Sequence, residues 1–154
     1  APWLQAMGVK VIGHSRQPGP EWTYPNLPLN DLLVQSDVVS LHIPLTAETH
    51  SMFNTQRFAS FKLGAILVNT ARGELVDEAA LTDALESGRL SLACLDVFAQ
   101  EPLAPDHPLL ARTDVLATPH MAWLTQDMFQ RALAVAIENT HRTLRGAPLL
   151  HQVQ

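Results

Sequence analysis

The chain has 154 residues, of which 47% are hydrophobic and 16% are charged. Because a domain usually has about 100–200 residues, this length predicts one domain, or one domain with an appendage. Fifteen acidic against ten basic residues give a net charge of −5, which argues against a nucleic-acid-binding face. No apolar run reaches the ~18 residues that a membrane span requires. A single cysteine, Cys94, excludes a disulfide scaffold, and no histidine spacing indicates a metal site. These features predict a cytoplasmic, soluble domain.

Short apolar runs rich in β-branched residues alternate with helical patterns along the chain. In chain order they predict a helix over residues 1–7, a strand over 9–13, a helix over 29–35, a strand over 37–43, a helix over 55–61, a strand over 65–70, a helix over 77–87, strands over 92–98 and 114–118, and a helix over 125–144. Residues 17–28 predict a long surface loop. Because the strands are apolar on both sides, the pattern indicates an α/β fold, a doubly wound parallel sheet covered by helices on both faces.

Polar and ionisable residues follow directly after the predicted strands, where ligands bind in an open parallel sheet. Arg72, Glu101 and His120 each follow a different strand. A histidine with a carboxylate partner can stay protonated near neutral pH and act as a general acid. An arginine offers a bidentate fork for a substrate carboxylate. These residue types suit the reduction of a carbonyl group that stands next to a carboxylate.

Five motifs, in this order along the chain, resemble the D-isomer-specific 2-hydroxyacid dehydrogenases. They are His42-Ile43-Pro44-Leu45-Thr46, Val68-Asn69-Thr70-Ala71-Arg72-Gly73, Leu95-Asp96-Val97-Phe98 with Glu101-Pro102, His107-Pro108-Leu109, and Thr118-Pro119-His120. The resemblance extends from about Gly8 to Pro148. It implies a Rossmann-type domain that takes part in hydride transfer between NAD(P)H and a small 2-oxo acid or D-2-hydroxy acid, in a protein that is a homodimer when intact.

The resemblance also implies a role for each matching residue. Arg72 would hold the substrate, His120 would donate the proton to the carbonyl oxygen, and Glu101 would pair with His120. Asp96 would face the nicotinamide carboxamide or ribose, and Pro44 would lie near the adenine. The full set of expected cofactor-binding residues is Ser15, Arg16, His42, Pro44, Thr70, Ala71, Arg72, Asp96, His120 and Ala122.

The sequence departs from the family pattern in two places. The glycine-rich fingerprint does not precede the first helix, so we expect a sheet without its first strand and glycine-rich loop. Residues 1–122 would form a partial dinucleotide-binding domain, residues 123–154 a long helix and tail that return toward a substrate domain, and the fragment alone would be inactive. Second, Ser15 and Arg16 occupy the place of the aspartate that binds the ribose in NAD-dependent members. This predicts a preference for NADP, with NAD possible.

Several alternatives stay open at this point. The same family includes dinucleotide-sensing corepressors that keep the Arg/Glu/His set. Formate oxidation is disfavoured, because that branch has a glutamine where Glu101 stands. Trp123 resembles the glycerate dehydrogenase/hydroxypyruvate reductase branch, or else packs over the last helix. Structurally, Arg72 could be a surface ion-pair residue, Glu101 a solvated turn residue and His42 a packed residue at a strand end.

Overall fold

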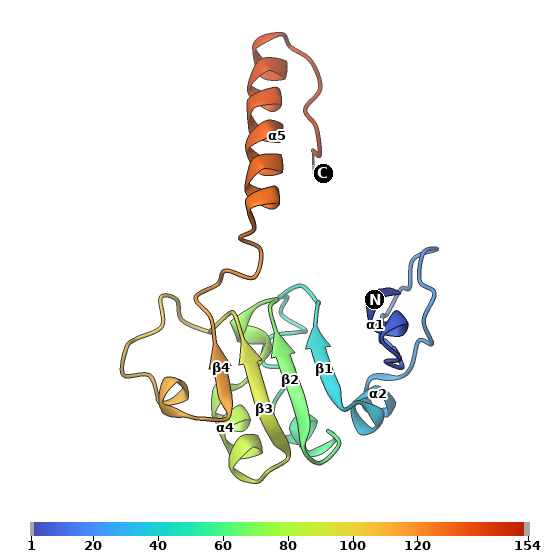
Figure 1. Cartoon of the computed structure of the whole chain (residues 1–154), viewed down its shortest axis with the longest axis vertical. Coiled ribbons are helices and arrows are strands. Elements are labelled where there is room, and N and C mark those ends of the chain that lie inside the picture. The colour runs from blue at the N-terminus through green and yellow to red at the C-terminus, as the bar shows by residue number, and fades with distance from the viewer. Residues whose placement is uncertain (1, 153–154) are drawn as a thin grey trace. The chain divides into compact units, whose positions relative to one another are not determined.

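A computed structural model describes residues 2–152. The chain forms two compact units, a sheet unit over Ala1–Pro119 and a helix unit over His120–Gln154. The sheet unit contains four parallel strands, β1 (Val38–Leu41), β2 (Ala65–Asn69), β3 (Leu90–Leu95) and β4 (Val115–Ala117), in that spatial order (Figure 1). Leu41, Asn69, Leu95 and Ala117 stand in one row across the sheet. The strands therefore end at the same level, and the residues that follow them emerge along one edge. The expected parallel sheet is confirmed.

The helices of the sheet unit begin and end close to the expected residues. They are α1 (Pro2–Ala6), α2 (Leu29–Gln35), α3 (Thr55–Ala59) and α4 (Glu78–Glu86), with short 3-10 helices η1 (Gly73–Leu75) and η2 (Pro108–Ala111). Helix α4 is capped by the carboxylate of Asp77, which accepts hydrogen bonds from the amides of Ala79 and Ala80 at 3.0 and 3.1 Å. Such a cap is typically worth about 1 kcal/mol, which explains why the helix begins directly after this residue.

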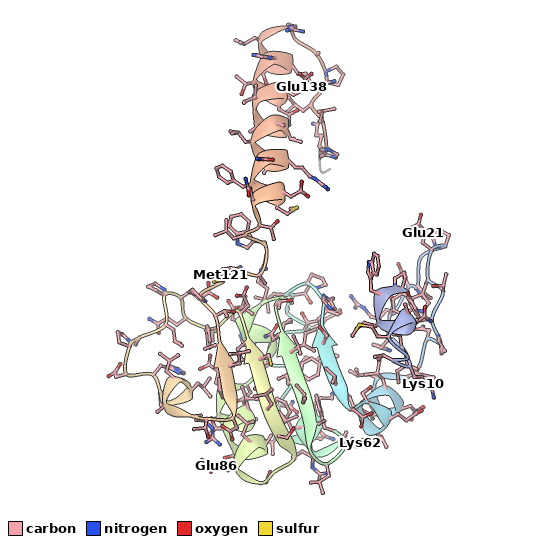
Figure 2. The ribbon with its side chains drawn as sticks, viewed as in Figure 1. Lys10, Glu21, Lys62, Glu86, Met121 and Glu138 are labelled. Atoms are coloured by element: carbon pink, nitrogen blue, oxygen red, sulfur yellow. The ribbon has the colours of Figure 1, made fainter. Side chains whose placement is uncertain are left out.

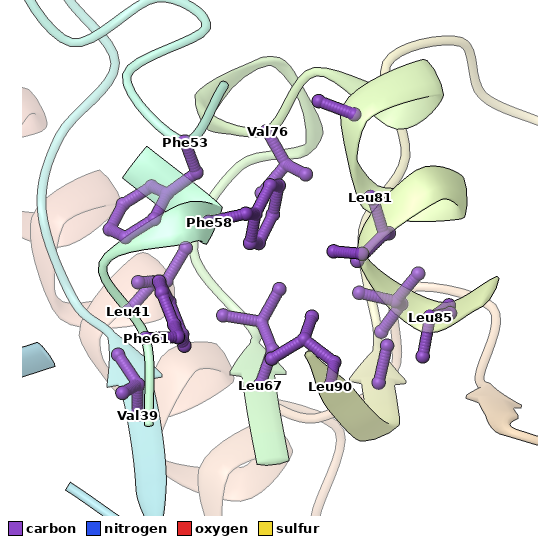
Figure 3. Close-up of a cluster of buried hydrophobic side chains, with 14 of the residues drawn as sticks. Val39, Leu41, Phe53, Phe58, Phe61, Leu67, Val76, Leu81, Leu85 and Leu90 are labelled. Atoms are coloured by element: carbon purple, nitrogen blue, oxygen red, sulfur yellow. The ribbon is translucent and has the colours of Figure 1, made fainter. Parts of the chain in front are cut away.

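The hydrophobic core lies on one face of the sheet, between the strands and helices α2, α3 and α4 (Figure 3). Three phenylalanines, Phe53, Phe58 and Phe61, pack with ring centroids 5.4–6.4 Å apart. Leu67 of β2 and Leu81 of α4 are 0% and 1% exposed beside them. At roughly 1.5–3 kcal/mol for each buried large side chain, this cluster is the main source of stability of the sheet unit.

The opposite face of the sheet is more exposed than the core face. Val38 and Leu116 on this face are 54% and 58% exposed, and Cys94 is partly buried. Helix α1 contributes no buried residue. Among the described residues of the sheet unit, the buried core therefore lies on a single face. Apolar runs alone do not show which element covers each face.

The strand predicted over residues 9–13 does not form. Only Gly13 pairs, in an isolated parallel bridge with Asn26, with its amide bonded to Pro25 O at 3.0 Å and its carbonyl to Leu27 N at 2.9 Å. The apolar Val9 is 46% exposed. A strand persists where a neighbouring strand accepts its backbone hydrogen bonds, and this short pairing supplies too few of them.

The helix unit is built on α5 (Gln126–Leu144), which begins at the Thr125 cap. The chain after α5 returns along it, and the side-chain amide of Asn139 bonds both the carbonyl and the amide of Leu150, at 3.2 and 2.8 Å. Among the described residues, no helix has both the length and the apolar character needed to cross a bilayer. The division into residues 1–122 and 123–154 stays a prediction.

Candidate active site at the strand ends

A buried asparagine shapes the turn that carries Arg72. Asn69, the last residue of β2, is 1% exposed. Its side-chain amide donates to the carbonyl of Arg72 at 2.9 Å, and its side-chain oxygen accepts from the amide of Ala71 at 3.1 Å. Both ends of the turn are therefore fixed by one side chain. The guanidinium of Arg72 is exposed and donates to the carbonyl of Ala71 at 2.6 Å, and Thr70 is exposed beside it.

The turn that carries Arg72 lies directly against the loop that carries Glu101. A Cβ added to Gly73 would lie 1.9 Å from the carbonyl carbon of Phe98 and 2.4 Å from the amide nitrogen of Ala99. The two backbones are therefore in contact, and only glycine leaves the space. Within the second loop, the carboxylate of Glu101 accepts a hydrogen bond from the amide of Phe98 at 3.0 Å. The structure thus brings together the two segments that carry Arg72 and Glu101.

Asp96 lies at the end of β3 and is 4% exposed. Its amide donates to the carbonyl of Asn69 at 3.0 Å, and its carboxylate accepts from the hydroxyl of Thr118 at 2.5 Å. The amide of Thr118 in turn donates to Leu95 at 2.9 Å. A buried carboxylate needs such partners. These bonds fix the position of the segment that leads to His120 at the end of β4.

The end of β1 carries His42 and Pro44. The ring Nε2 of His42, which is exposed, lies 2.9 Å from the hydroxyl of Ser40. Because the ring is exposed, His42 is not packed among core side chains in this structure. The carbonyl of Pro44 accepts from the hydroxyl of Thr49 at 2.8 Å, and Thr49 is 8% exposed. The loop after β1 is therefore held by a buried threonine.

Ser15 and Arg16 follow the bridge at Gly13. The side chain of Asn26 holds Ser15 from both sides, because it accepts from the Ser15 amide at 2.8 Å and donates to the Ser15 carbonyl at 3.1 Å. The guanidinium of Arg16 pairs with the carboxylate of Glu48 at 2.7 Å, with side-chain exposures of 71% and 75%. This pair ties the segment to the loop after β1. Figure 2 shows Lys62 and Glu86 at the end of the sheet where the strands begin, opposite to their carboxyl ends.

His120 and Ala122 belong to the helix unit. His120 has a backbone φ of 52°, in the left-handed region that non-glycine residues seldom adopt. The indole of Trp123 donates to the carbonyl of His120 at 3.1 Å and supports this turn. Trp123 is 55% exposed, so that it braces the turn rather than filling a core. The pairing of His120 with Glu101 stays a prediction.

Five residues that support the site were not predicted as site residues. They are Asn26, Glu48, Asn69, Gly73 and Thr118. Asn69 could have been found, because a polar residue that ends an apolar strand has to be satisfied inside the fold. The described residues contain no cluster of three or more His, Cys, Asp or Glu side chains suited to a metal ion.

Known proteins match most of the chain. The glyoxylate/hydroxypyruvate reductase B of Shigella flexneri is 45% identical over 118 residues, which cover 77% of this chain and 36% of that protein. A D-isomer specific 2-hydroxyacid dehydrogenase from Xanthobacter autotrophicus, in complex with NADPH and MES, is 39% identical with a TM-score of 0.82, over 98% of this chain and 63% of that one. A D-lactate dehydrogenase with NAD+ from Lactobacillus jensenii is 32% identical with a TM-score of 0.90, over 99% and 50%.

The match is to one part of longer proteins. The chain spans less than half the length of the curated relatives it matches, 46%, 44% and 36% for three of them. The sheet with its flanking helices is Rossmann-like, as in these dehydrogenases. The family model described as D-isomer specific 2-hydroxyacid dehydrogenase, NAD binding domain, matches residues 1–122. The chain therefore belongs to the D-isomer specific 2-hydroxyacid dehydrogenase family, and it carries the NAD-binding domain.

Proposed function

We propose that the protein carrying this chain reduces a small 2-oxo acid, of the hydroxypyruvate and glyoxylate class, to the D-2-hydroxy acid. The observation that carries this proposal is the backbone contact between Gly73 and Phe98. Through it, the Arg72 and Glu101 segments meet at the carboxyl edge of a parallel sheet, where substrates bind in such folds. The reductase name of the Shigella flexneri relative supports the choice of substrate class. The comparisons do not support the corepressor alternative.

In this proposal the chain supplies the polar groups of the reaction. The guanidinium of Arg72, whose backbone carbonyl is bonded by Asn69, binds the carboxylate and the carbonyl oxygen of the substrate through its planar fork. The protonated imidazole of His120 donates a proton to that oxygen as the carbonyl carbon is reduced, and takes the proton back in the reverse direction. Glu101 pairs with the imidazolium and orients it. The charges of Arg72 and His120 would stabilise the charge that develops on that oxygen.

The donor set of the sheet edge fits a nicotinamide dinucleotide. Ser15 and Arg16, held by Asn26, offer a hydroxyl and a guanidinium for the adenosine ribose, with Pro44 and His42 near the adenine. Thr70, Ala71, Asp96 and Ala122 would line the nicotinamide site. When bound, the reduced nicotinamide supplies the hydride. Because Asp96 and Thr118 are already bonded to each other, this part of the site is rigid before the cofactor arrives.

We infer a preference for NADPH over NADH from the residues that follow Gly13. Arg16 can donate charge-assisted hydrogen bonds to a 2′-phosphate, and Ser15 brings no repulsive carboxylate. The competing partner of Arg16 is Glu48, in a pair that is largely exposed. Exposed pairs are worth only about 0–1 kcal/mol, so that a 2′-phosphate can displace this carboxylate. The homodimer stays a prediction from the resemblance, and the cytoplasmic location stays a prediction from the composition.

The experiment uses the full-length product of the gene that encodes this chain. Turnover of hydroxypyruvate and glyoxylate is followed by NADPH and NADH oxidation, and kcat/KM is expected to be higher with NADPH. Ser15→Asp should flatten or reverse this ratio, whereas Ser51→Asp, a control substitution in a different loop, should leave it unchanged. Equal kcat/KM for both cofactors would remove the cofactor preference, and no turnover of any 2-oxo acid would remove the reductase assignment.

A further inference from the structure

A contact between Glu78 and His107 lies beside the loop that carries Glu101. Glu78, the first residue of α4, accepts a hydrogen bond from the amide of Ala99 through one carboxylate oxygen at 3.2 Å. Its other oxygen lies 3.3 Å from Nε2 of His107. The ring Nδ1 of His107 accepts from the amide of Leu109 at 3.4 Å and caps η2. The start of α4 and the start of η2 are thus joined directly by the contact between Glu78 and His107. The loop is attached to this contact through the amide of Ala99.

Most residues of the loop at residues 98–104 are exposed. Ala99, Gln100, Glu101, Pro102 and Ala104 are exposed. A hollow of about 240 Å³ lies against the loop, with Glu78 and His107 among the residues that line it. On this side the loop therefore lacks close packing, and polar contacts have to hold it. Beyond the two ends of the pair, the restraints on the loop include the Gly73 contact, the Phe98–Glu101 hydrogen bond, the buried Phe98, the partly buried Leu103 and the hydrogen bond from the amide of His107 to the carbonyl of Ala104 at 3.0 Å.

We propose that Glu78 and His107 are positioning residues, which hold the loop at residues 98–104 so that Glu101 is presented to the reaction. The pair is suited to this because its side chains are only 28% and 25% exposed, and partial burial makes a charge-assisted contact more effective than one on the open surface. Neither residue reaches the substrate in this account. Both act through Ala99 and the loop. This inference rests on the proposed function of Glu101.

Three substitutions separate the parts of the contact. Glu78→Gln keeps an oxygen that can accept from Ala99 and loses the charge. Glu78→Ala loses both. His107→Asn keeps an acceptor at the start of η2, because asparagine is a good N-cap residue, but its side chain is too short to reach Glu78. Glu86→Ala is the matched control, since it removes a carboxylate from the last turn of the same helix, where Glu86 pairs with Arg112 at 3.3 Å, far from the loop.

The experiment uses the full-length gene product and has two readouts. In hydrogen–deuterium exchange, the peptide covering residues 98–104 should exchange faster in Glu78→Ala and His107→Asn than in the parent. The increase should be smaller in Glu78→Gln, which keeps the acceptor for Ala99, and Glu86→Ala should exchange at the parent rate. In turnover, Glu78→Ala should lower kcat by about 10–100-fold, as displacements near 1 Å do in other enzymes. The KM for NADPH should not change. The solvent deuterium isotope effect on kcat should rise, because proton transfer becomes slower.

The outcomes distinguish this inference from the proposed function. If the parent turns over no 2-oxo acid, the proposed function fails, while the exchange readout still tests the hold on the loop. An unchanged exchange rate at residues 98–104 in both Glu78→Ala and His107→Asn overturns the inference. An equal loss of kcat in Glu86→Ala also overturns it, because the effect would then be on the stability of α4. If Glu78→Ala does not fold, His107→Asn and Glu78→Gln decide the question alone.

Discussion

Replacing Gly73 by alanine tests the contact on which the candidate site depends. The added Cβ would lie 1.9 Å from the carbonyl carbon of Phe98 and 2.2 Å from its carbonyl oxygen. Ordinary van der Waals contact begins at 3.4 Å, so that the methyl group is about 1.5 Å too close. Its neighbours are backbone atoms, which cannot rotate away as a side chain would. The turn and the loop must therefore separate.

The loss in the free energy of unfolding can be judged from the contacts that this separation disturbs. Overpacking a well-packed site usually costs about 1–3 kcal/mol and occasionally more. Here the strain falls between two backbones, one held by Asn69 and the other by Glu101. We therefore expect Gly73→Ala to lower the free energy of unfolding by at least about 3 kcal/mol. That is a large share of the roughly 5–15 kcal/mol that holds a typical domain together.

The assay is urea denaturation of the full-length gene product, followed by circular dichroism, with the parent and two variants compared. Gly64→Ala is the matched control, because Gly64 has a φ of +75° but open space around its Cβ position. It should cost only the roughly 1–2 kcal/mol of a left-handed alanine. If Gly73→Ala is no more destabilising than Gly64→Ala, the two segments are not in contact and the site as described is wrong.

Three further predictions concern single interactions. Asn69→Ala should lower the free energy of unfolding by about 2–4 kcal/mol in urea titrations, because two backbone partners in the Arg72 turn lose their bonds; a loss below 1 kcal/mol contradicts this. Arg112, bonded to Asp114 at 2.8 Å through two nitrogens, lowers the pKa of the Asp114 carboxyl. The stabilisation that this pair gives the fold is therefore present above the ordinary carboxyl pKa and is lost as the pH falls through the lowered value. Asp114→Asn should thus reduce the urea midpoint at neutral pH and leave it unchanged in strong acid. A difference in urea midpoint that does not depend on pH would contradict this link between the Asp114 carboxyl and stability. Arg72→Lys should raise the KM for the 2-oxo acid by at least about tenfold in steady-state kinetics, since a point charge cannot replace the fork; an unchanged KM removes Arg72 from substrate binding.

The helices and the parallel sheet were predictable because their signals are local. The apolar face of α4 and its Asp77 cap mark both the type of the element and its start. The strand expected over residues 9–13 shows the limit of this reasoning. Its β-branched pattern satisfies the local rule, but a strand also needs a neighbour for its hydrogen bonds, and only Gly13 pairs in this segment.

The candidate site residues could be named from the sequence, whereas most of the residues that hold them in place could not. Arg72, Glu101 and His120 stand directly after or shortly beyond strands, where a parallel sheet places its ligands. Glu78 and His107 are separated by almost thirty residues, and nothing in the sequence pairs them. Gly73 resembles any turn glycine in the sequence. Position 73 requires glycine because the backbone of Phe98 lies against it, and this contact forms only in the folded chain.

The central claim is that this chain supplies the proton donor for reduction of a 2-oxo acid. The most direct measurement is the turnover number for hydroxypyruvate with NADPH, in the full-length gene product and in its His120→Ala variant, together with the Kd of NADPH for both. The account predicts measurable turnover in the parent, a loss of about 10²–10⁴-fold in kcat for the variant, and similar Kd values for NADPH. A variant that keeps the parent kcat, or a parent that binds NADPH and reduces no 2-oxo acid, would contradict it.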